Sequence, residues 1–166
     1  PNEHWQEVRG QYLYRGISPM TWIKYGVGML PPGELKRITG RYSDPHFEAA
    51  GISAFGRQGY SWLGEGVVVI RHSEYGVPKG LAVRRYPQLT GGRLDGAKYV
   101  KNSASSELLD TSSYVFGLDG LEENPTVAWV VEGEFDALAM RTRGLPNVLT
   151  YGSGTPADGQ AEVLQE

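Results

Sequence analysis

The stretch TVAWVVEGEFDALAM, residues Thr126–Met140, decides the fold of this chain. Its apolar first half predicts a buried β-strand over 126–131, and a helical pattern starts at Phe135. Between the two stand Glu132 and Gly133, a carboxylate followed by a residue that tolerates a sharp bend. Ligands of open α/β sheets bind outside the carboxyl ends of the strands. We therefore expect Glu132 at the tip of a buried strand, facing a ligand.

A second strand follows the predicted helix. The helical pattern runs over 135–143 and ends with Gly144 at the C′ position. Residues 147–151 are apolar and rich in β-forming side chains, which predicts a strand. Residues 126–151 should therefore form one βαβ unit with parallel strands and a right-handed crossover.

The loop after this second strand is Gly152-Ser153-Gly154. Its backbone N–H groups could cradle a phosphate at the start of the next helix, although a plain turn explains the same residues. That helix should begin with Thr155 as N-cap and Pro156 at N1.

The upstream part of the chain mixes helical and β patterns. Ser18 as N-cap followed by a proline predicts a short helix that stops at Gly26. The β-branched run 67–71 and the later run 81–86 predict a pair of antiparallel strands. The predicted fold class is α+β: a mixed α/β subdomain over 1–120 with antiparallel strands, then the parallel βαβ unit within 121–166.

Composition limits the possible functions. The 166 residues include no cysteine, which excludes disulfides and any thiolate zinc site in this chain. The three histidines are far apart in the sequence and show no ligand spacing. No apolar run reaches the ~20 residues of a membrane span and no signal peptide is visible. We therefore expect a cytoplasmic protein that makes no membrane contact.

The charge is divided unevenly along the chain. Residues 1–101 carry 14 Lys and Arg against 8 acids, a net +6, and residues 102–166 carry 2 against 11, a net −9. A basic first part and an acidic second part suit a protein that holds a polyanion with one and metal ions with the other. Uneven solvated surface is the alternative explanation.

The segment 130–139 resembles the first motif of the Toprim domain. That domain is shared by DnaG-type primases, phage primase–helicases, topoisomerases and some nucleases. The resemblance implies metal-dependent phosphoryl transfer, with Mg²⁺ or Mn²⁺ and no zinc in this chain. The strand at 147–151 and the loop Gly152–Gly154 resemble the second Toprim strand and its small-residue loop.

Upstream segments narrow the resemblance to the RNA polymerase core of primases. The segments that resemble that core in order are 12–19, 47–52, 98–103 and 114–118; the segment 98–103 has one extra residue between Tyr99 and Asn102. This resemblance implies synthesis of RNA primers on a single-stranded DNA template from nucleoside triphosphates. A replicative helicase, fused or separate, is the implied partner.

Two departures from the primase pattern stand out. The zinc-binding domain usual at the N-terminus of such primases has no counterpart here, and the Asp-x-Asp metal motif expected on the next Toprim strand lies beyond Glu166. We therefore expect a fragment of a larger primase or primase–helicase, truncated within the Toprim domain and inactive by itself.

The acids of the motif have separate expected roles. The resemblance favours Glu132 as the catalytic residue, acting as a metal ligand or as the base that takes the hydroxyl proton. Asp136, four residues later, would be a second metal ligand if both acids share one face. Each acid could instead only stabilise the N-terminus of the helix. We expect Glu134 to point to solvent.

Basic and polar residues upstream are candidates for binding nucleic acid or nucleotides. Lys98 and Asn102 are favoured near the active site by the resemblance, and a solvated loop is the alternative. Arg84 and Arg85 are adjacent in a predicted strand and face opposite ways, so at most one lines a given groove. The full set of expected binding residues is Arg84, Arg85, Lys98, Lys101, Asn102, Gly152, Ser153 and Gly154.

Two other functions fit parts of the pattern. The chain could be a module that binds single-stranded DNA or a partner protein without chemistry, using Toprim as a scaffold. It could also belong to a Toprim nuclease or topoisomerase, although no residue here stands out as the tyrosine nucleophile that a topoisomerase needs.

Overall fold

The computed structural model of the chain describes Gly10 and residues 15–30, 67–74, 77–84, 99–101, 113–152 and 155–165. The helix predicted near 47–51 lies outside these residues. No helix in the described part of the chain is long and apolar enough to cross a bilayer. The described elements are α2 Pro19–Lys24, β1 Val27–Leu30, β2 Val67–Glu74, β3 Val77–Arg84, β4 Tyr99–Lys101, the 3₁₀ turn η4 Leu118–Gly120, β5 Trp129–Val130, α5 Glu134–Thr142, β6 Val148–Leu149 and α6 Asp158–Val163.

The short helix α2 begins where the sequence predicts. The Ser18 hydroxyl accepts a hydrogen bond from the Thr21 amide at 3.2 Å, and Pro19 occupies the first helical turn. The helix ends at Lys24, and Gly26 adopts the left-handed conformation at φ 61° that starts the turn into β1. The cap and the glycine are local signals, so the sequence alone located this helix.

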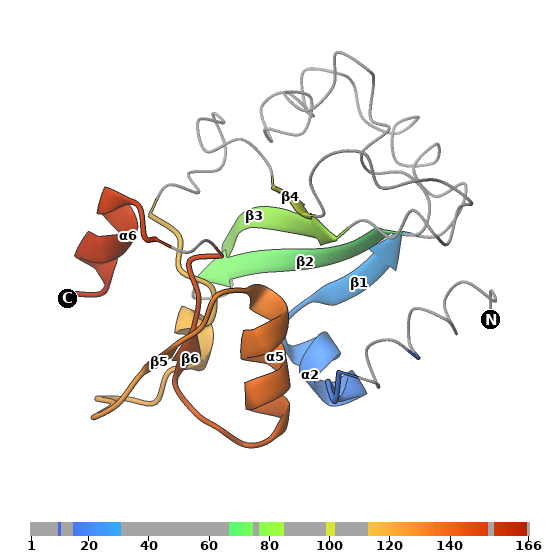
Figure 1. Cartoon of the computed structure of the whole chain (residues 1–166), viewed down its shortest axis with the longest axis horizontal. Coiled ribbons are helices and arrows are strands. Elements are labelled where there is room, and N and C mark those ends of the chain that lie inside the picture. The colour runs from blue at the N-terminus through green and yellow to red at the C-terminus, as the bar shows by residue number, and fades with distance from the viewer. Residues whose placement is uncertain are drawn as a thin grey trace, which may run out of the picture.

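Four strands form one antiparallel sheet in the order β1-β2-β3-β4 (Figure 1). The β-branched run predicted over 67–71 is β2, which continues to Glu74. The returning strand predicted over 81–86 is β3, which starts earlier, at Val77. A register shift between His72 and Ser73 marks a bulge near the turn that joins the two strands.

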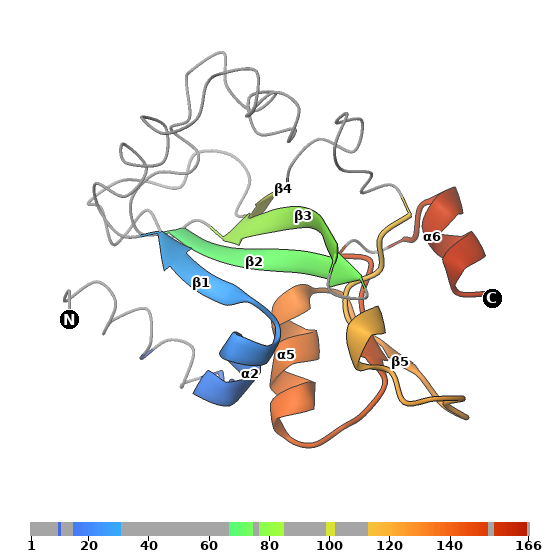
Figure 2. The same ribbon diagram turned by 180° about the vertical axis from the view of Figure 1, so that it is seen from behind.

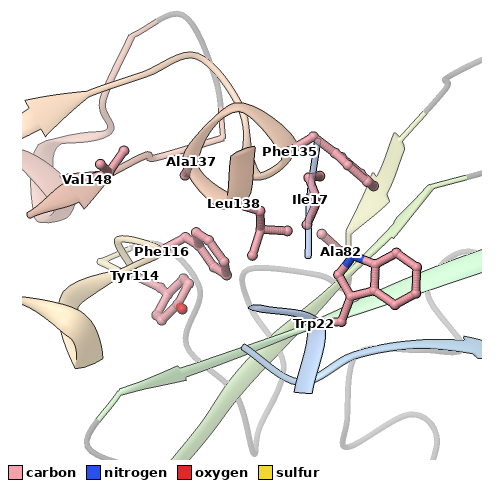
Figure 3. Packing of buried hydrophobic residues seen from close by; sticks show 9 residues of the cluster. All are labelled: Ile17, Trp22, Ala82, Tyr114, Phe116, Phe135, Ala137, Leu138 and Val148. Carbon is pink, nitrogen blue, oxygen red and sulfur yellow. The ribbon is translucent and has the colours of Figure 1, made fainter. Parts of the chain in front are cut away.

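Helices α2 and α5 lie on the same side of this sheet (Figures 1 and 2). The buried cluster between them draws Ile17 and Trp22 from the α2 region, Ala82 from β3, and Phe135 and Leu138 from α5 (Figure 3). Residues on both sides of the predicted domain boundary therefore share one cluster. It is completed by Tyr114, Phe116, Ala137 and Val148.

The βαβ unit is present, with β5 and β6 parallel and α5 between them along the chain. The left-handed Gly144, φ 81°, follows the C-cap of α5 as predicted. The prediction of a buried first strand is wrong. The strand is only Trp129–Val130, and Trp129 is 50% exposed. A β-branched sequence favours the strand conformation, whereas burial depends on neighbours from elsewhere in the fold.

The last helix begins later than its sequence signals predict. Its N-cap is Ala157, two residues beyond the predicted Thr155. The buried Gln160 decides this start, because its Oε1 accepts from the Ala157 amide at 2.9 Å while its Nε2 donates to the Tyr114 carbonyl at 2.7 Å. A contact with a distant segment therefore overrides the local Thr-Pro signal.

Candidate functional site

The predicted catalytic acid lies in the turn between β5 and α5. Glu132 is exposed and precedes Gly133, the N-cap of α5. Asp136 is exposed in the first helical turn, with its Oδ2 atom 3.7 Å from where a Cβ on Gly133 would lie. The helix starts only at Glu134, so Glu132 and Asp136 do not share a helix face. They lie on either side of Gly133, at the positive end of the α5 dipole.

Glu134 is not exposed, contrary to the sequence prediction. Only 3% of its surface is accessible, as for the adjacent Phe135. Glu134, Leu138 and Arg141 follow the spacing i, i+4, i+7, which places them on one helix face. Because that face packs inward, Glu134 is not available as a third exposed acid beside Glu132.

Two guanidinium groups approach the ring of Phe135, close to the acidic turn. The Arg84 guanidinium carbon lies 5.0 Å from the ring centre and that of Arg15 lies 5.7 Å away. Arg84 is 6% exposed, whereas Arg15 is exposed. Arg15 was not predicted as a site residue. It is 117 residues from Glu132 in the sequence, so no spacing pattern could link it to the acidic motif.

Strand pairing brings the lysine-rich candidate segment beside Arg84. In the β3–β4 register, Arg84 lies opposite Tyr99 and Ala82 lies opposite Lys101. Residues 99–101 form strand β4, which pairs with β3. The last residue of β3, Arg84, contacts the ring of Phe135 next to the acidic turn. The other predicted binding residues of this region, Arg85, Lys98 and Asn102, lie outside the described residues.

The glycine loop after β6 is joined to the acidic turn. The Gly152 amide donates to the Thr150 hydroxyl at 2.8 Å, and this hydroxyl donates to the Glu132 carbonyl at 3.0 Å. The Gly152 N–H group already donates to a protein atom, so the predicted phosphate cradle has one fewer backbone donor. The predicted Ser153 and Gly154 lie outside the described residues.

Arg141 fastens the far end of α5. Its guanidinium donates to the carbonyls of Gly117 and Val148, each at 2.9 Å, and to that of Gly120. It also lies 5.5 Å from the ring centre of Tyr25. Burial raises the pKa of the Tyr25 phenol, and the charge and hydrogen bond of Arg141 lower it in part. These contacts fix the helix that carries Asp136 to β6 and to the turn after Phe116.

The acids of the turn suit a hard divalent cation as part of a larger donor set. No group of three His, Cys, Asp or Glu side chains gathers anywhere in the described ranges. Glu132 and Asp136 nevertheless offer two exposed acids on either side of Gly133 in the sequence, with the Asp136 carboxylate close to that glycine. Mg²⁺ is commonly held by one or two carboxylates together with water and substrate phosphates. The residues present therefore fit such an ion as two of its ligands.

Comparison with known proteins identifies structures with a similar fold, but no family that matches by sequence. No protein-family model and no curated protein matches the chain. Among solved structures, it is similar to the Aquifex aeolicus primase, zinc-binding and RNA polymerase domains, with a TM-score of 0.76 and 23% identity over 96% of this chain and 40% of that chain.

Other solved primases give the same result. The RNA polymerase domain of Mycobacterium tuberculosis primase DnaG matches with a TM-score of 0.74 and 24% identity, over 98% of this chain and 54% of that one. The E. coli primase catalytic core matches with a TM-score of 0.72 and 20% identity, over 99% of this chain and 53% of that one. This chain thus spans about half the length of these primase chains.

Some of these relatives were crystallised with nucleic acid. The M. tuberculosis domain was solved in complex with a double-stranded DNA oligomer that has a 6-nucleotide overhang, and it matches with a TM-score of 0.71 and 25% identity over 95% of this chain and 50% of that one. This chain therefore has a mixed α/β fold with a short parallel sheet, and its fold is that of the catalytic RNA polymerase domain of DnaG primases.

Proposed function

We propose that this chain is part of a DNA primase, which makes RNA primers on single-stranded DNA by metal-dependent nucleotidyl transfer. The observation that carries the proposal is the acidic turn: two exposed acids, Glu132 and Asp136, flank Gly133 in the sequence at the start of α5. The similarity in fold to primase catalytic domains over nearly the whole chain supports it. Because those chains are about twice as long, the activity is proposed for the full-length protein.

We assign residues 121–166 to part of a Toprim domain. The parallel strands β5 and β6, with α5 between them, support this assignment, as does an acid directly after the first strand. Both residues of β5, Trp129 and Val130, are exposed apolar side chains, and so is Val127 just before the strand. This exposure is compatible with further sheet beyond β5, as a complete Toprim domain would have.

The acidic turn would serve the chemistry of strand extension. Glu132 and Asp136 would hold Mg²⁺ or Mn²⁺, and the bound cation would neutralise the charge that develops on the triphosphate and activate the attacking 3′-hydroxyl. Glu132 would also be able to accept the hydroxyl proton, since its side chain is exposed. The N-terminus of α5 favours negative charge in the same place.

Basic residues would position the polyanionic substrates. Arg15 is exposed and 5.7 Å from the ring centre of Phe135, so its charge is available to a phosphate near the turn. Strand β4 carries Lys101 next to β3 on the same sheet. The triphosphate substrates and an associated replicative helicase, fused or separate, remain predictions from the sequence.

The test is incubation of the full-length protein with single-stranded DNA, labelled nucleoside triphosphates and Mg²⁺ or Mn²⁺. The proposal predicts short RNA products that depend on template and disappear when the cation is chelated. DNA cleavage instead of synthesis would indicate a Toprim nuclease or topoisomerase. Salt-sensitive DNA binding without either reaction, unaffected by the cation, would indicate a binding module and would refute the proposal.

A further inference from the structure

The Thr150 hydroxyl makes two hydrogen bonds that join separate loops of the site. Thr150 follows β6 and is 1% exposed. Its Oγ1 donates to the Glu132 carbonyl at 3.0 Å and accepts from the Gly152 amide at 2.8 Å. A hydroxyl has a single proton, so these two bonds use it as one donor and one acceptor. The turn that carries the acid and the loop after β6 are thereby held by one atom.

The Thr150 hydroxyl bonds to the chain just beyond the backbone hydrogen bonds that pair the β5 and β6 segments. Parallel pairing brings the Trp129 amide to the Asn147 carbonyl at 2.8 Å and the Val131 amide to the Leu149 carbonyl at 2.9 Å. At the next step, the Glu132 carbonyl is bonded by the side chain of Thr150. The backbone of Thr150 is meanwhile occupied on its other side, since its N–H and C=O both bond to Phe116.

We propose that Thr150 is a positioning residue for the primer-forming reaction, and this rests on the function proposed above. Its hydroxyl fixes the backbone of Glu132 relative to β6 and to the Gly152 loop, so the carboxylate starts from a defined place. Thr150 acts only through Glu132 and Gly152 and does not touch the substrate. The two hydrogen bonds of the Thr150 hydroxyl form a clamp that holds the acid in place before the reaction. Such positioning matters because an error of about 1 Å can cost up to about a hundredfold in rate.

Valine is the isosteric test of the hydroxyl. Thr150→Val keeps the shape of the side chain but leaves the Glu132 carbonyl and the Gly152 amide without their shared partner. The matched control is Thr142→Val at the last residue of α5. The Thr142 hydroxyl likewise donates to a backbone carbonyl, that of Leu138 at 2.9 Å, and accepts from a backbone amide, that of Ser18 at 3.1 Å. It also shares a hydrogen bond of 2.8 Å with the Thr21 hydroxyl.

The control removes three hydrogen bonds of a hydroxyl far from the acid, against the two that Thr150→Val removes, so it is the more demanding test of stability. Thr142 is the last residue of α5, roughly 12 Å along the helix axis from its first residue, Glu134, and Glu132 lies before that first residue. A loss of activity that comes only from lost stability would therefore appear in both valine variants. A positioning role would appear in Thr150→Val alone.

The experiment measures primer synthesis by the full-length protein at a temperature where every variant is folded. We expect Thr150→Val to lower kcat about tenfold with the KM for nucleoside triphosphate unchanged, because the change misplaces the acid without touching the substrate site. Thr150→Ser should restore kcat, and Thr142→Val should keep it. Equal kcat for Thr150→Val and Thr142→Val would overturn the proposal.

Two further measurements keep the test decisive. If Thr150→Val does not fold, the pair Thr150→Ser and Thr150→Ala isolates the hydroxyl, since both lack the methyl group, and equal kcat for that pair would overturn the proposal. Hydrogen exchange at the Gly152 amide should quicken in Thr150→Val and not in Thr142→Val, and equal exchange would refute the clamp regardless of activity. Absence of RNA products from the wild-type protein would instead refute the proposed function.

Discussion

The guanidinium carbon of Arg84 lies 5.0 Å from the centre of the Phe135 ring, so the end of β3 meets the first turn of α5. Arg15 lies 5.7 Å from the same ring centre. The two cations differ in exposure, because Arg84 is buried and Arg15 is open to solvent. We therefore expect Arg84 to contribute to the stability of the fold and Arg15 to be available to a ligand.

Methionine substitutions should separate these two roles. Arg84→Met should lower the unfolding free energy by about 1–3 kcal/mol, because a buried cation–ring contact is lost. Arg15→Met should change it by less than about 1 kcal/mol, yet reduce the salt dependence of single-stranded DNA binding by about one phosphate contact. Denaturant unfolding and fluorescence anisotropy measure the two effects. Identical behaviour of the two variants in both assays would contradict the assignment.

Arg141 should be sensitive to replacement by lysine. Arg141→Lys cannot span the carbonyls of Gly117, Gly120 and Val148, because lysine has one compact charge in place of a planar fork. We expect a loss of about 2–3 kcal/mol in unfolding free energy. The matched control is Arg143→Lys, since exposed Arg143 donates only to the Ala139 carbonyl among the hydrogen bonds found in the described residues. Denaturant unfolding should show a clear loss for the first variant, and equal losses would argue against the role of the fork.

Two glycines near the site should respond differently to alanine. Gly117 has φ 102°, and a Cβ there would lie 2.5 Å from the Val148 carbonyl oxygen. Gly117→Ala should therefore destabilise the fold by about 1–3 kcal/mol or more. Gly133 is extended at φ −142°, and a Cβ would meet only the Asp136 carboxylate, at 3.7 Å. Gly133→Ala should leave thermal stability close to wild type; a large loss there would show that the turn needs more conformational freedom than the structure indicates.

Alkaline pH should destabilise the fold partly through Tyr25. Its pKa is raised by burial above the ordinary value of 10.0. Below that value the phenol is protonated in the folded and the unfolded chain. As pH rises further, the unfolded chain loses its proton first, so stability falls until the folded phenol also ionises. Tyr25→Phe should therefore lose less stability than wild type between about pH 9 and pH 11. Parallel pH profiles of the two proteins, measured by denaturant unfolding, would contradict this.

Local signals in the sequence predicted the elements they control. The cap at Ser18 and the C′ glycine at 144 located the ends of two helices, because each acts within one turn of backbone. The exposure of β5 and the burial of Glu134 could not be predicted in the same way. Both depend on which surface each element presents to partners distant in sequence. The positions of Arg15 and Thr150 in the site were not predicted, because they depend on contacts of the same kind.

The sequence predicted where Glu132 and Asp136 lie relative to the strand and the helix, but not which basic side chains pack near them. The strand-end position of Glu132 follows from the apolar run that ends there, and Asp136 follows from the helical pattern. The predicted binding residue Arg84 proved to be buried over an aromatic ring, a contact that no sequence spacing reveals.

The most direct test of the account is the rate of RNA primer formation by the full-length protein carrying Glu132→Gln. Glu123→Gln is the matched control, because Glu123 is also an exposed acid and lies in the segment before β5. The account predicts that Glu132→Gln lowers the rate by about a hundredfold or more at unchanged affinity for single-stranded DNA, since only the transition state uses the carboxylate. A rate within about twofold of the Glu123→Gln control would contradict the central claim that the turn after β5 is the catalytic site.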